Sequence, residues 1–298
     1  MSVVVIFHNE ERYLADAIDS VVAQDFVNWE MVLVDDGSTD RSAEIALAAA
    51  VSDSRICCVS QPGGANLGAS AARNLGVARA RGVHVAFLDA DDLWLPHKLS
   101  SQLGHLATHP GTRAVYGPLT LFGDDPTVPG FIDGKLYGLE CDGVIVESDR
   151  VYHPPELVTL FIPHNDLYPS GAMFERALYH EIGGADPEFR DYYEDGVLWL
   201  KMCLCASVYC TSESTYLYRQ HADSSTAVAA RSGRGVQEET RYFDWVEEYL
   251  GRQPGEIAHE VWKALAEARR PYLHPYRHKA LETARRLRRR LSRLRRSR

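Results

Sequence analysis

Short apolar runs rich in β-branched residues recur through the first 120 residues, and a stretch with helical spacing follows most of them. Continuous short apolar runs indicate buried strands, whereas apolar residues recurring every three or four positions predict helices. The predicted strands cover residues 3–7, 31–34, 56–59, 83–88 and 114–117. The predicted helices cover about residues 13–22, 41–50, 69–80 and 96–109, and we expect Asn9 and Asp40 to cap the first two. This order predicts an α/β fold with a mostly parallel sheet that helices flank on both faces.

The pattern changes after residue 117. Residues 118–168 contain many Gly, Pro and Asp and predict irregular loops of the kind that often carry binding function. Later predicted elements are a strand at 170–174, a helix ending near 182, a helix at 195–206, a strand end or loop at 216–221, and helices from about 235 onward. We therefore expect one domain over residues 1–230, with halves 1–117 and 118–230, and a helical C-terminal extension over 231–298 that ends in a basic amphipathic tail.

Charge is distributed unevenly along the 298 residues, whose formal net charge is −9. Residues 263–298 contain 14 Lys and Arg against two Glu, whereas the rest of the chain contains 18 Lys and Arg against 39 Asp and Glu. The acidic body should repel nucleic acid, so we expect no nucleic-acid partner. The basic tail is either a solvated terminus or a helix that lies on an anionic membrane surface, and both interpretations stay open.

The sequence also bears on the cellular compartment. No secretory signal pattern follows Met1, and no apolar run approaches the roughly 20 residues of a transmembrane helix. The six cysteines form no C-x-x-C pair, which favours reduced thiols. We expect a cytoplasmic protein, and under the second interpretation of the tail it would contact the inner face of the membrane.

Two predicted strands, the second and the fourth, end in clusters of carboxylates: Asp35, Asp36, Asp89, Asp91 and Asp92. In an open parallel sheet, ligands bind beyond the carboxyl ends of the strands. Clustered carboxylates repel one another, and a cation or a hydrogen-bonding ligand usually offsets that repulsion. The alternative interpretation is that some of these residues only serve turns and helix caps.

Four strings occupy these predicted strand–loop–helix positions in order: VLVDDGSTDRS, NLGASAARNLG, FLDADDLWLPHKL and YYEDGVLWLKM. Together they resemble the family 2 nucleotide-sugar glycosyltransferases, over about residues 2–221. The resemblance implies an A-type glycosyltransferase fold, which is a Rossmann-like α/β domain with a D-x-D metal motif. It also implies inverting transfer of a sugar from a nucleotide-sugar donor.

The resemblance assigns roles around the nucleotide diphosphate. It implies that Asp36 hydrogen-bonds the nucleobase, that Asp89 lies near the ribose, and that Asp91 binds Mg²⁺ or Mn²⁺. Such an ion neutralises the charge that develops on the leaving diphosphate. His221 matches a position near the diphosphate, where a neutral imidazole can ligate the metal. Arg219 either contacts phosphate or forms a surface ion pair.

Asp195 matches the catalytic base of the family. An inverting transfer needs one carboxylate to take the proton of the acceptor hydroxyl as its oxygen attacks. A helix that begins at Asp195 would favour the ionised carboxylate that a base requires. The alternative role for Asp195 is an N-terminal helix cap. Its neighbour Glu194 is expected to contact the acceptor or to support Asp195.

The remaining candidates resemble the donor-binding wall of the family. Asn66 and Arg73 lie there, and Arg73 either reaches the base or phosphate of the nucleotide or pairs with a carboxylate. We expect Phe7 and Asn9 to contact the nucleotide, although the sequence around them replaces the usual proline of the family. Residues 183–185 are Gly-Gly-Ala where the family usually has Gly-Gly-Phe, which removes an aromatic wall from the acceptor pocket.

The resemblance implies transfer of a sugar from a UDP- or dTDP-sugar to a hydroxyl of a carbohydrate or lipid-linked acceptor, in polysaccharide, glycolipid or glycoconjugate synthesis. The sequence is less consistent with two other functions. A sugar-nucleotide-binding module without activity would not need both Asp91 and Asp195. A sugar-1-phosphate nucleotidyltransferase would have a Gly-rich loop near its N-terminus, and residues 3–12 contain no glycine. The oligomeric state is not predicted.

Overall fold

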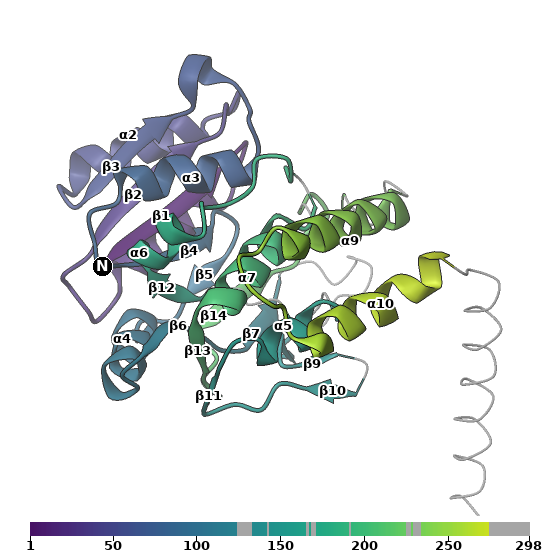
Figure 1. The fold of residues 1–298 in the computed structure, drawn as a ribbon. Coiled ribbons are helices and arrows are strands. Elements are labelled where there is room, and N and C mark those ends of the chain that lie inside the picture. Colours follow the sequence, from purple (N-terminus) through teal and green to yellow (C-terminus); the bar gives the residue numbers. More distant parts are fainter. Residues whose placement is uncertain are drawn as a thin grey trace, which may run out of the picture.

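An eight-stranded sheet runs through the centre of the protein (Figure 1). The structure, a computed structural model, describes residues 1–123, 133–141, 143–164, 167, 171–190, 192–224, 228 and 234–273. The sheet has the order β11-β13-β6-β12-β4-β1-β2-β3. Its strands are β1 Ser2–Phe7, β2 Glu30–Asp35, β3 Ile56–Ser60, β4 His84–Asp89, β6 Thr112–Tyr116, β11 Arg150–Tyr152, β12 Met173–Glu175 and β13 Ser207–Cys210. The β3-β2-β1-β4 half is entirely parallel, while β12 runs antiparallel between β4 and β6. The predicted mostly parallel sheet is therefore confirmed.

A second, four-stranded sheet has the order β5-β14-β7-β8. Its strands are β5 Leu93–Trp94, β7 Leu119–Phe122, β8 Leu136–Tyr137 and β14 Tyr216–Arg219, and a separate pair is formed by β9 Glu140–Cys141 and β10 Val144–Ile145. Pairing of β14 with β5 brings the chain after residue 215 beside the chain that leaves β4. This pairing therefore brings the residues that follow β14 close to the residues between β4 and β5.

Helices cover both faces of the large sheet. One core lies against α1 Leu14–Val22, α2 Ser42–Ser52 and α4 Lys98–Thr108. The opposite core lies against α3 Ala69–Arg79, α5 Glu156–Phe161, α6 Arg176–Glu181 and α7 Glu194–Cys205. Val3 and Val5 belong to the first core and Val4 to the second, because successive strand residues point to opposite faces. Both faces are covered, which explains why β1 is apolar without interruption.

Two further helices, α9 Gly235–Gly251 and α10 His259–Leu273, form the predicted helical C-terminal region (Figure 1). Tyr242 and Val246 of α9 and Val261 and Leu265 of α10 are buried in the same core as α7. The predicted basic amphipathic tail lies outside the described residues. Among the residues that the structure does describe, no helix is long and apolar enough to cross a membrane.

Several local expectations were wrong. Asn9 does not cap α1, which begins five residues later behind a turn that starts at Glu10. Asp40 lies one position before the N-cap of α2, although its Oδ1 still accepts the Ser42 N–H at 2.9 Å. The segment 118–168 is not simply irregular, since its described part contains five short strands and α5. The strand β13 was missed because its short apolar run directly follows the apolar helix α7.

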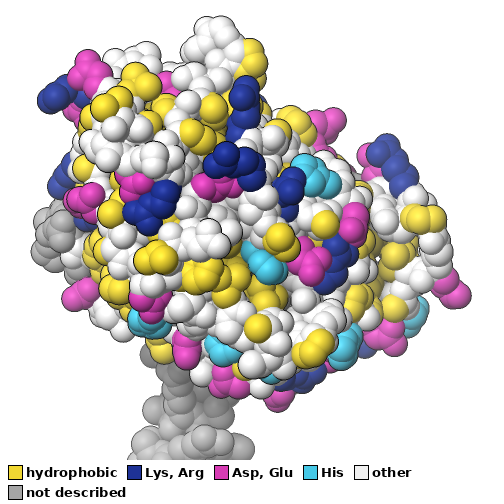
Figure 2. All heavy atoms as spheres, turned by 90° about the vertical axis from the view of Figure 1, so that its left-hand side faces the viewer, with side chains coloured by type: hydrophobic (Ala, Val, Ile, Leu, Met, Phe, Trp, Pro, Cys, Tyr) yellow, Lys and Arg dark blue, Asp and Glu magenta, His cyan; other side chains and the backbone are white. Residues whose placement is uncertain are grey.

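The face of the molecule drawn in Figure 2 bears on the expected charge distribution. Lys and Arg side chains on it are interspersed with Asp and Glu, and hydrophobic side chains lie between them. A polyanion such as nucleic acid binds best to a continuous basic surface. The described residues on this face do not form one, in keeping with the acidic body of the chain.

Gly76 sets how closely α3 approaches the sheet. A Cβ at this position would overlap Val4 Cγ1 and would lie 3.1 Å from Val34 Cγ2. We expect Gly76→Ala to lower the free energy of unfolding by about 1–3 kcal/mol through overpacking. The control is Gly104→Ala in α4, where a Cβ would meet nothing within 4 Å. This substitution should raise the free energy of unfolding by up to about 1 kcal/mol through helix propensity. Urea unfolding measures both, and equal effects of the two substitutions would contradict the close packing of α3.

Candidate active site

The carboxyl ends of β1, β2 and β4 meet at one edge of the large sheet. The strand register pairs Phe7 with Asp35 and Ile6 with Asp89. The two carboxylate clusters therefore lie at the same edge of the sheet, on either side of the end of β1. The Phe7 side chain is buried in the core, and its carbonyl accepts the Asp36 N–H at 2.9 Å. A contact of Phe7 with a nucleotide would have to come from its backbone.

Asn9 connects the loop after β1 to the loop after β2. Its backbone has a φ of 58°, and its Oδ1 accepts the N–H groups of Thr39 at 2.7 Å and Asp40 at 3.3 Å. Its own N–H donates to Ser38 Oγ at 3.1 Å. The observed role of Asn9 is thus to fix two loops at the site, and its contact with the nucleotide stays a prediction.

Asp36 holds the loop that precedes α3. One carboxylate oxygen accepts the Leu67 N–H at 2.9 Å and the other accepts the Gly68 N–H at 2.8 Å. Gly68 has a φ of 91° and packs so tightly that a Cβ there would lie 2.9 Å from Arg190 Cβ. Arg190 Nη2 in turn donates to the Asn66 carbonyl at 2.7 Å and to Asn66 Oδ1 at 3.0 Å. The sequence motifs did not point to Arg190, which lies outside them.

Arg73 lies between two carboxylates that come from different elements. Its Nη2 is 3.3 Å from Asp89 Oδ1, and its Nη1 is 3.5 Å from Glu194 Oε1. The guanidinium also lies over the Phe87 ring, 5.6 Å from its centre. Of the two roles that the sequence left open for Arg73, pairing with carboxylates is the one that the structure shows. Its buried Nη1 forms no hydrogen bond with the described residues.

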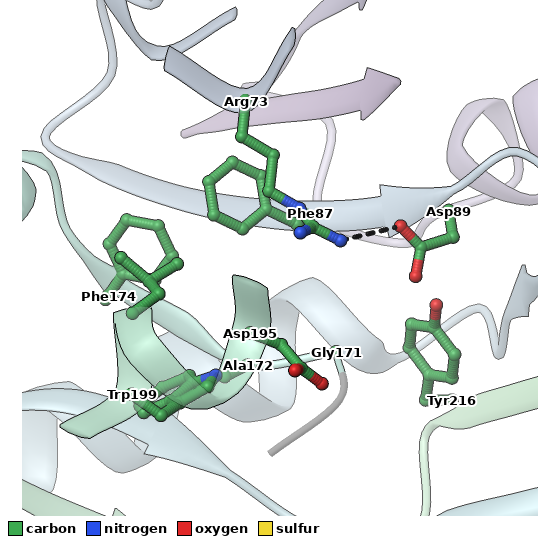
Figure 3. Close-up of a pocket in the computed structure, with 10 residues that line it drawn as sticks. Arg73, Phe87, Asp89, Gly171, Ala172, Phe174, Asp195, Trp199 and Tyr216 are labelled. Atoms are coloured by element: carbon green, nitrogen blue, oxygen red, sulfur yellow. Dashed lines mark hydrogen bonds and ion pairs between the residues drawn. The ribbon is translucent and has the colours of Figure 1, made fainter. Parts of the chain in front are cut away.

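Asp195 lines the same pocket as Arg73 and Asp89 (Figure 3). The exposed Asp195 lies in the first turn of α7, and its Oδ1 accepts the Gly196 N–H at 2.7 Å. The positive end of a helix dipole stabilises an anionic side chain there. Apolar side chains, including Phe174 of β12, also line this pocket. The pocket thus combines an accessible carboxylate with an apolar wall and a buried guanidinium.

Asp91 and His221 come together although 130 positions separate them. Asp91 Oδ2 lies 2.9 Å from His221 Nε2. Two ligand atoms about 2.1 Å from one ion, at right angles, are about 3.0 Å apart, so this pair fits neighbouring positions on one Mg²⁺ or Mn²⁺. The described residues contain no group of three or more His, Cys, Asp or Glu that could hold a metal. Water and ligand phosphates would supply the other ligands, as is usual for Mg²⁺.

Asp92 ties β14 to the end of β4. Its Oδ2 accepts the Tyr216 hydroxyl at 2.6 Å, its Oδ1 accepts the Arg219 N–H at 2.7 Å, and burial raises the pKa of its carboxyl. Arg219 Nε donates to the Asp91 carbonyl at 2.8 Å, and its Nη2 lies 3.3 Å from Asp16 Oδ2. Asp92 therefore has a structural role. Arg219 forms an ion pair with Asp16, but its side chain is buried and not on the surface, and its contact with phosphate stays a prediction.

Glu10 is a site residue that the sequence analysis missed. The pKa of its carboxyl is raised to about 7, chiefly by burial and also by the charge of Asp91, while His221 opposes the shift. Its backbone N–H donates to Ser42 Oγ at 2.8 Å. The only available signal was its place just after β1, at the same sheet edge as the carboxylate clusters.

Glu194 precedes the candidate base and lies largely out of water. Its side chain is 20% exposed. The pKa of Glu194 is raised to about 7, chiefly by burial and also by the charge of the adjacent Asp195, while Arg73 opposes the rise. Two neighbouring carboxyls thus experience different environments, since Glu194 is enclosed while Asp195 is exposed.

Comparison with known proteins identifies the family. The model described as glycosyl transferase family 2 matches residues 2–183, which is more than half of the chain. The chain belongs to glycosyl transferase family 2. The matched part of this family 2 glycosyltransferase extends from β1 through α6, whereas α7 with Asp195 lies beyond it.

The family 2 chain is 28% identical over 255 residues to an uncharacterized glycosyltransferase of Nostoc sp., covering 82% of this chain and 74% of the relative. Its fold is similar to Staphylococcus aureus TarS 1–349 in complex with UDP-GlcNAc, with a TM-score of 0.69, 19% identity, and coverage of 92% of this chain and 72% of TarS. It is also similar to the mannosyltransferase PcManGT from Pyrobaculum calidifontis in complex with GDP-Man and Mn²⁺, with a TM-score of 0.61, 19% identity, and coverage of 95% and 74%. These similarities confirm the predicted A-type fold.

Glu194 should make the stability of the fold depend on pH. Its folded-state pKa of about 7 exceeds the ordinary value of 4.5, so the folded protein binds this proton more tightly. The resulting stabilisation is present below the ordinary value and is lost as pH rises through 7. We therefore expect the free energy of unfolding to fall less between about pH 5 and pH 8 in Glu194→Gln than in the wild type. Urea unfolding across this range measures it, with exposed Glu181→Gln as control; identical slopes in all three proteins would contradict the shift.

Proposed function

We propose that the chain is an inverting, metal-dependent glycosyltransferase that moves a sugar from a nucleotide-diphosphate sugar to an acceptor hydroxyl. One observation carries the proposal: Asp195 lines a pocket with Asp89 at the end of β4, just before the Asp91–His221 pair. In this proposal the base and the leaving diphosphate lie close together, beyond the end of β4. The family membership of the chain supports the transfer of a sugar.

The proposed donor is a UDP- or dTDP-sugar. TarS binds UDP-GlcNAc and PcManGT binds GDP-Man, so this fold accommodates more than one nucleobase. Asp36 would bind the base, since each of its carboxylate oxygens accepts one loop N–H and keeps a second lone pair. The loop that contains Asn66 would form one wall of the donor site, with Asn9 holding the loops on the other side.

Asp91 and His221 would hold the metal ion, and the Mn²⁺ in PcManGT supports this assignment. Bound there, Mg²⁺ or Mn²⁺ supplies Lewis-acid stabilisation of the leaving diphosphate. Arg219 keeps the Asp91 backbone in place through its 2.8 Å hydrogen bond to the Asp91 carbonyl. Asp89, adjacent to the pair and bound to Arg73, would lie against the ribose.

Asp195 would act as the general base. The acceptor oxygen attacks the anomeric carbon, the bond from that carbon to the diphosphate oxygen breaks, and the diphosphate leaves with the electron pair. The acceptor proton passes to the Asp195 carboxylate. Attack from the face opposite the leaving group inverts the anomeric configuration and needs no second protein acid. Glu194, enclosed and paired with Arg73, would support the base and contact the acceptor.

The acceptor is proposed to be a carbohydrate or lipid-linked hydroxyl, in polysaccharide, glycolipid or glycoconjugate synthesis. We place the reaction in the cytoplasm, with the basic tail as a peripheral contact to the inner membrane face. A thermal-shift screen of nucleoside diphosphates and nucleotide-sugars, with and without Mg²⁺ or Mn²⁺, identifies the donor because a bound ligand raises the melting temperature.

Asp195→Asn should abolish transfer yet leave donor affinity within about twofold. The amide keeps the size of the side chain but cannot accept the proton, and general-base catalysis contributes about 10²–10⁴-fold. Product formation and calorimetric donor binding measure the two quantities. Equal losses of binding and turnover would contradict the assigned role. Metal-dependent hydrolysis of the donor by the wild type, in the absence of acceptor, would separate an enzyme from a mere binding module.

Asp91→Ala should weaken nucleotide diphosphate binding at least tenfold, or about 1.4 kcal/mol, when Mn²⁺ is present. The substitution removes one of the two protein ligands proposed for the ion. Calorimetric titration with and without EDTA measures the effect. In EDTA the wild type and Asp91→Ala should bind the nucleotide equally weakly. A lower affinity of Asp91→Ala that persists without metal would rule out the metal-binding role of Asp91.

A further inference from the structure

We propose that helix α9 fixes the position of the catalytic base, through Arg241 and Trp245. This inference rests on the proposed function, because it concerns the placement of Asp195. We call residues 185–190 together with 192–195 the base segment. Both the base segment and α9 lie beyond the part of the chain that the family model matches.

Helix α3 holds the base segment from one side. Asn74 Nδ2 donates to the Ala185 carbonyl at 2.8 Å, and Asn74 Oδ1 accepts the Ala185 N–H at 3.0 Å. The buried Ser70 Oγ donates to the Phe189 carbonyl at 2.8 Å. These three hydrogen bonds fix the backbone at both ends of the stretch from 185 to 189. They leave its other side to be held by another element.

Helix α9 provides that second contact (Figure 1). Arg241 Nη2 donates to the Glu188 carbonyl at 2.6 Å, and its guanidinium lies 4.9 Å from the centre of the Phe189 ring. Trp245 Nε1 donates to Asp186 Oδ2 at 2.9 Å, and the two rings of Trp245 and Phe189 meet edge to face at 5.7 Å. The base segment is therefore bound between α3 and α9.

A third contact from α9 lies next to the base. Tyr193, the N-cap of α7, has a φ of 59° and a ψ of 11°, a left-handed conformation that is unfavourable for a bulky side chain. Its ring stacks on the fully buried Tyr242 of α9, with centres 4.8 Å apart and planes at 13°. Asp195 follows only two residues later. The stack therefore helps to fix the point at which α7 begins and the direction in which Asp195 emerges.

These residues act through the base segment and not on the ligand. Arg241, Tyr242 and Trp245 are absent from the described lining of the pocket. The donor contacts proposed above come instead from the sheet edge and from the loop around Asn66. Displacing a catalytic group by about 1 Å can cost about 100-fold in rate. Loss of the α9 contacts should therefore lower kcat and spare donor affinity.

The test compares Arg241→Ala with Arg252→Ala. Both remove an arginine from the α9 region, but Arg252 pairs with exposed Glu248, and its side chain forms no hydrogen bond or ion pair with the described residues of the base segment. The Arg241 side chain is 48% exposed, so its removal should leave the fold intact. We expect kcat to fall about 10- to 100-fold in Arg241→Ala, with donor KM and nucleotide Kd within about twofold, and no change in Arg252→Ala. Trp245→Phe, which keeps an aromatic ring and loses the hydrogen bond to Asp186, should give a smaller loss of kcat.

Two kinetic results would overturn the proposal: a kcat in Arg241→Ala equal to that of Arg252→Ala, or a parallel loss of kcat and donor affinity. If the wild type neither transfers nor hydrolyses any nucleotide-sugar, the proposed function fails instead, and hydrogen exchange tests the positioning separately. Amides of residues 185–196 should then exchange faster in Arg241→Ala than in Arg252→Ala, while β1–β4 stay equally protected. Unchanged exchange in that segment would refute the role of α9.

Discussion

The guanidinium of Arg73 lies between two carboxylates that the fold brings from distant parts of the chain, Asp89 from β4 and Glu194 from α7. Removing charged groups from water is costly unless they are paired, and one cation here faces a local excess of negative charge. This pairing allows the sheet edge and the N-terminus of α7 to approach each other. Without it, repulsion among Asp89, Glu194 and Asp195 would oppose the closed pocket in which the reaction is proposed to occur.

A second set of contacts joins the late part of the chain to the same edge. The buried Asp92 binds both Tyr216 and Arg219, and Arg219 binds the carbonyl of Asp91. Contacts from β14 therefore support the backbone beside Asp91, one member of the Asp91–His221 pair. Asp91 and His221 can adopt their 2.9 Å separation because β5 and β14 are neighbours in that sheet.

The sequence supports the fold better than it supports the details of the site. Continuous apolar runs such as β1 and the helical periodicity of segments such as α1 are strong signals, so the existence and order of these elements could be predicted. The short strand β13 could not, because four residues after an apolar helix carry no separate period.

The residues of the candidate site also fall into those that the sequence could identify and those that it could not. Carboxylates at strand ends, such as Asp36 and Asp91, could be found because a parallel sheet places its carboxyl ends at one edge. The alternatives for Arg73 and Arg219 could not be decided, because a sequence pattern does not say which carboxylate an arginine meets. Arg190 and Glu10 were missed for a related reason, since each acts through tertiary contacts that no spacing along the chain records.

The contacts of Asp36 bear on how a nucleobase would be selected. Both hydrogen bonds from the loop to this carboxylate are made within the protein alone. Binding of a nucleotide would then cost little free energy for ordering this loop, because the loop is already held in place in the free protein. Discrimination between pyrimidine and purine donors would accordingly arise from the shape of a rigid site and from the remaining lone pairs of Asp36. A nucleotide that fits this site poorly would bind weakly, because the loop would not adjust to it.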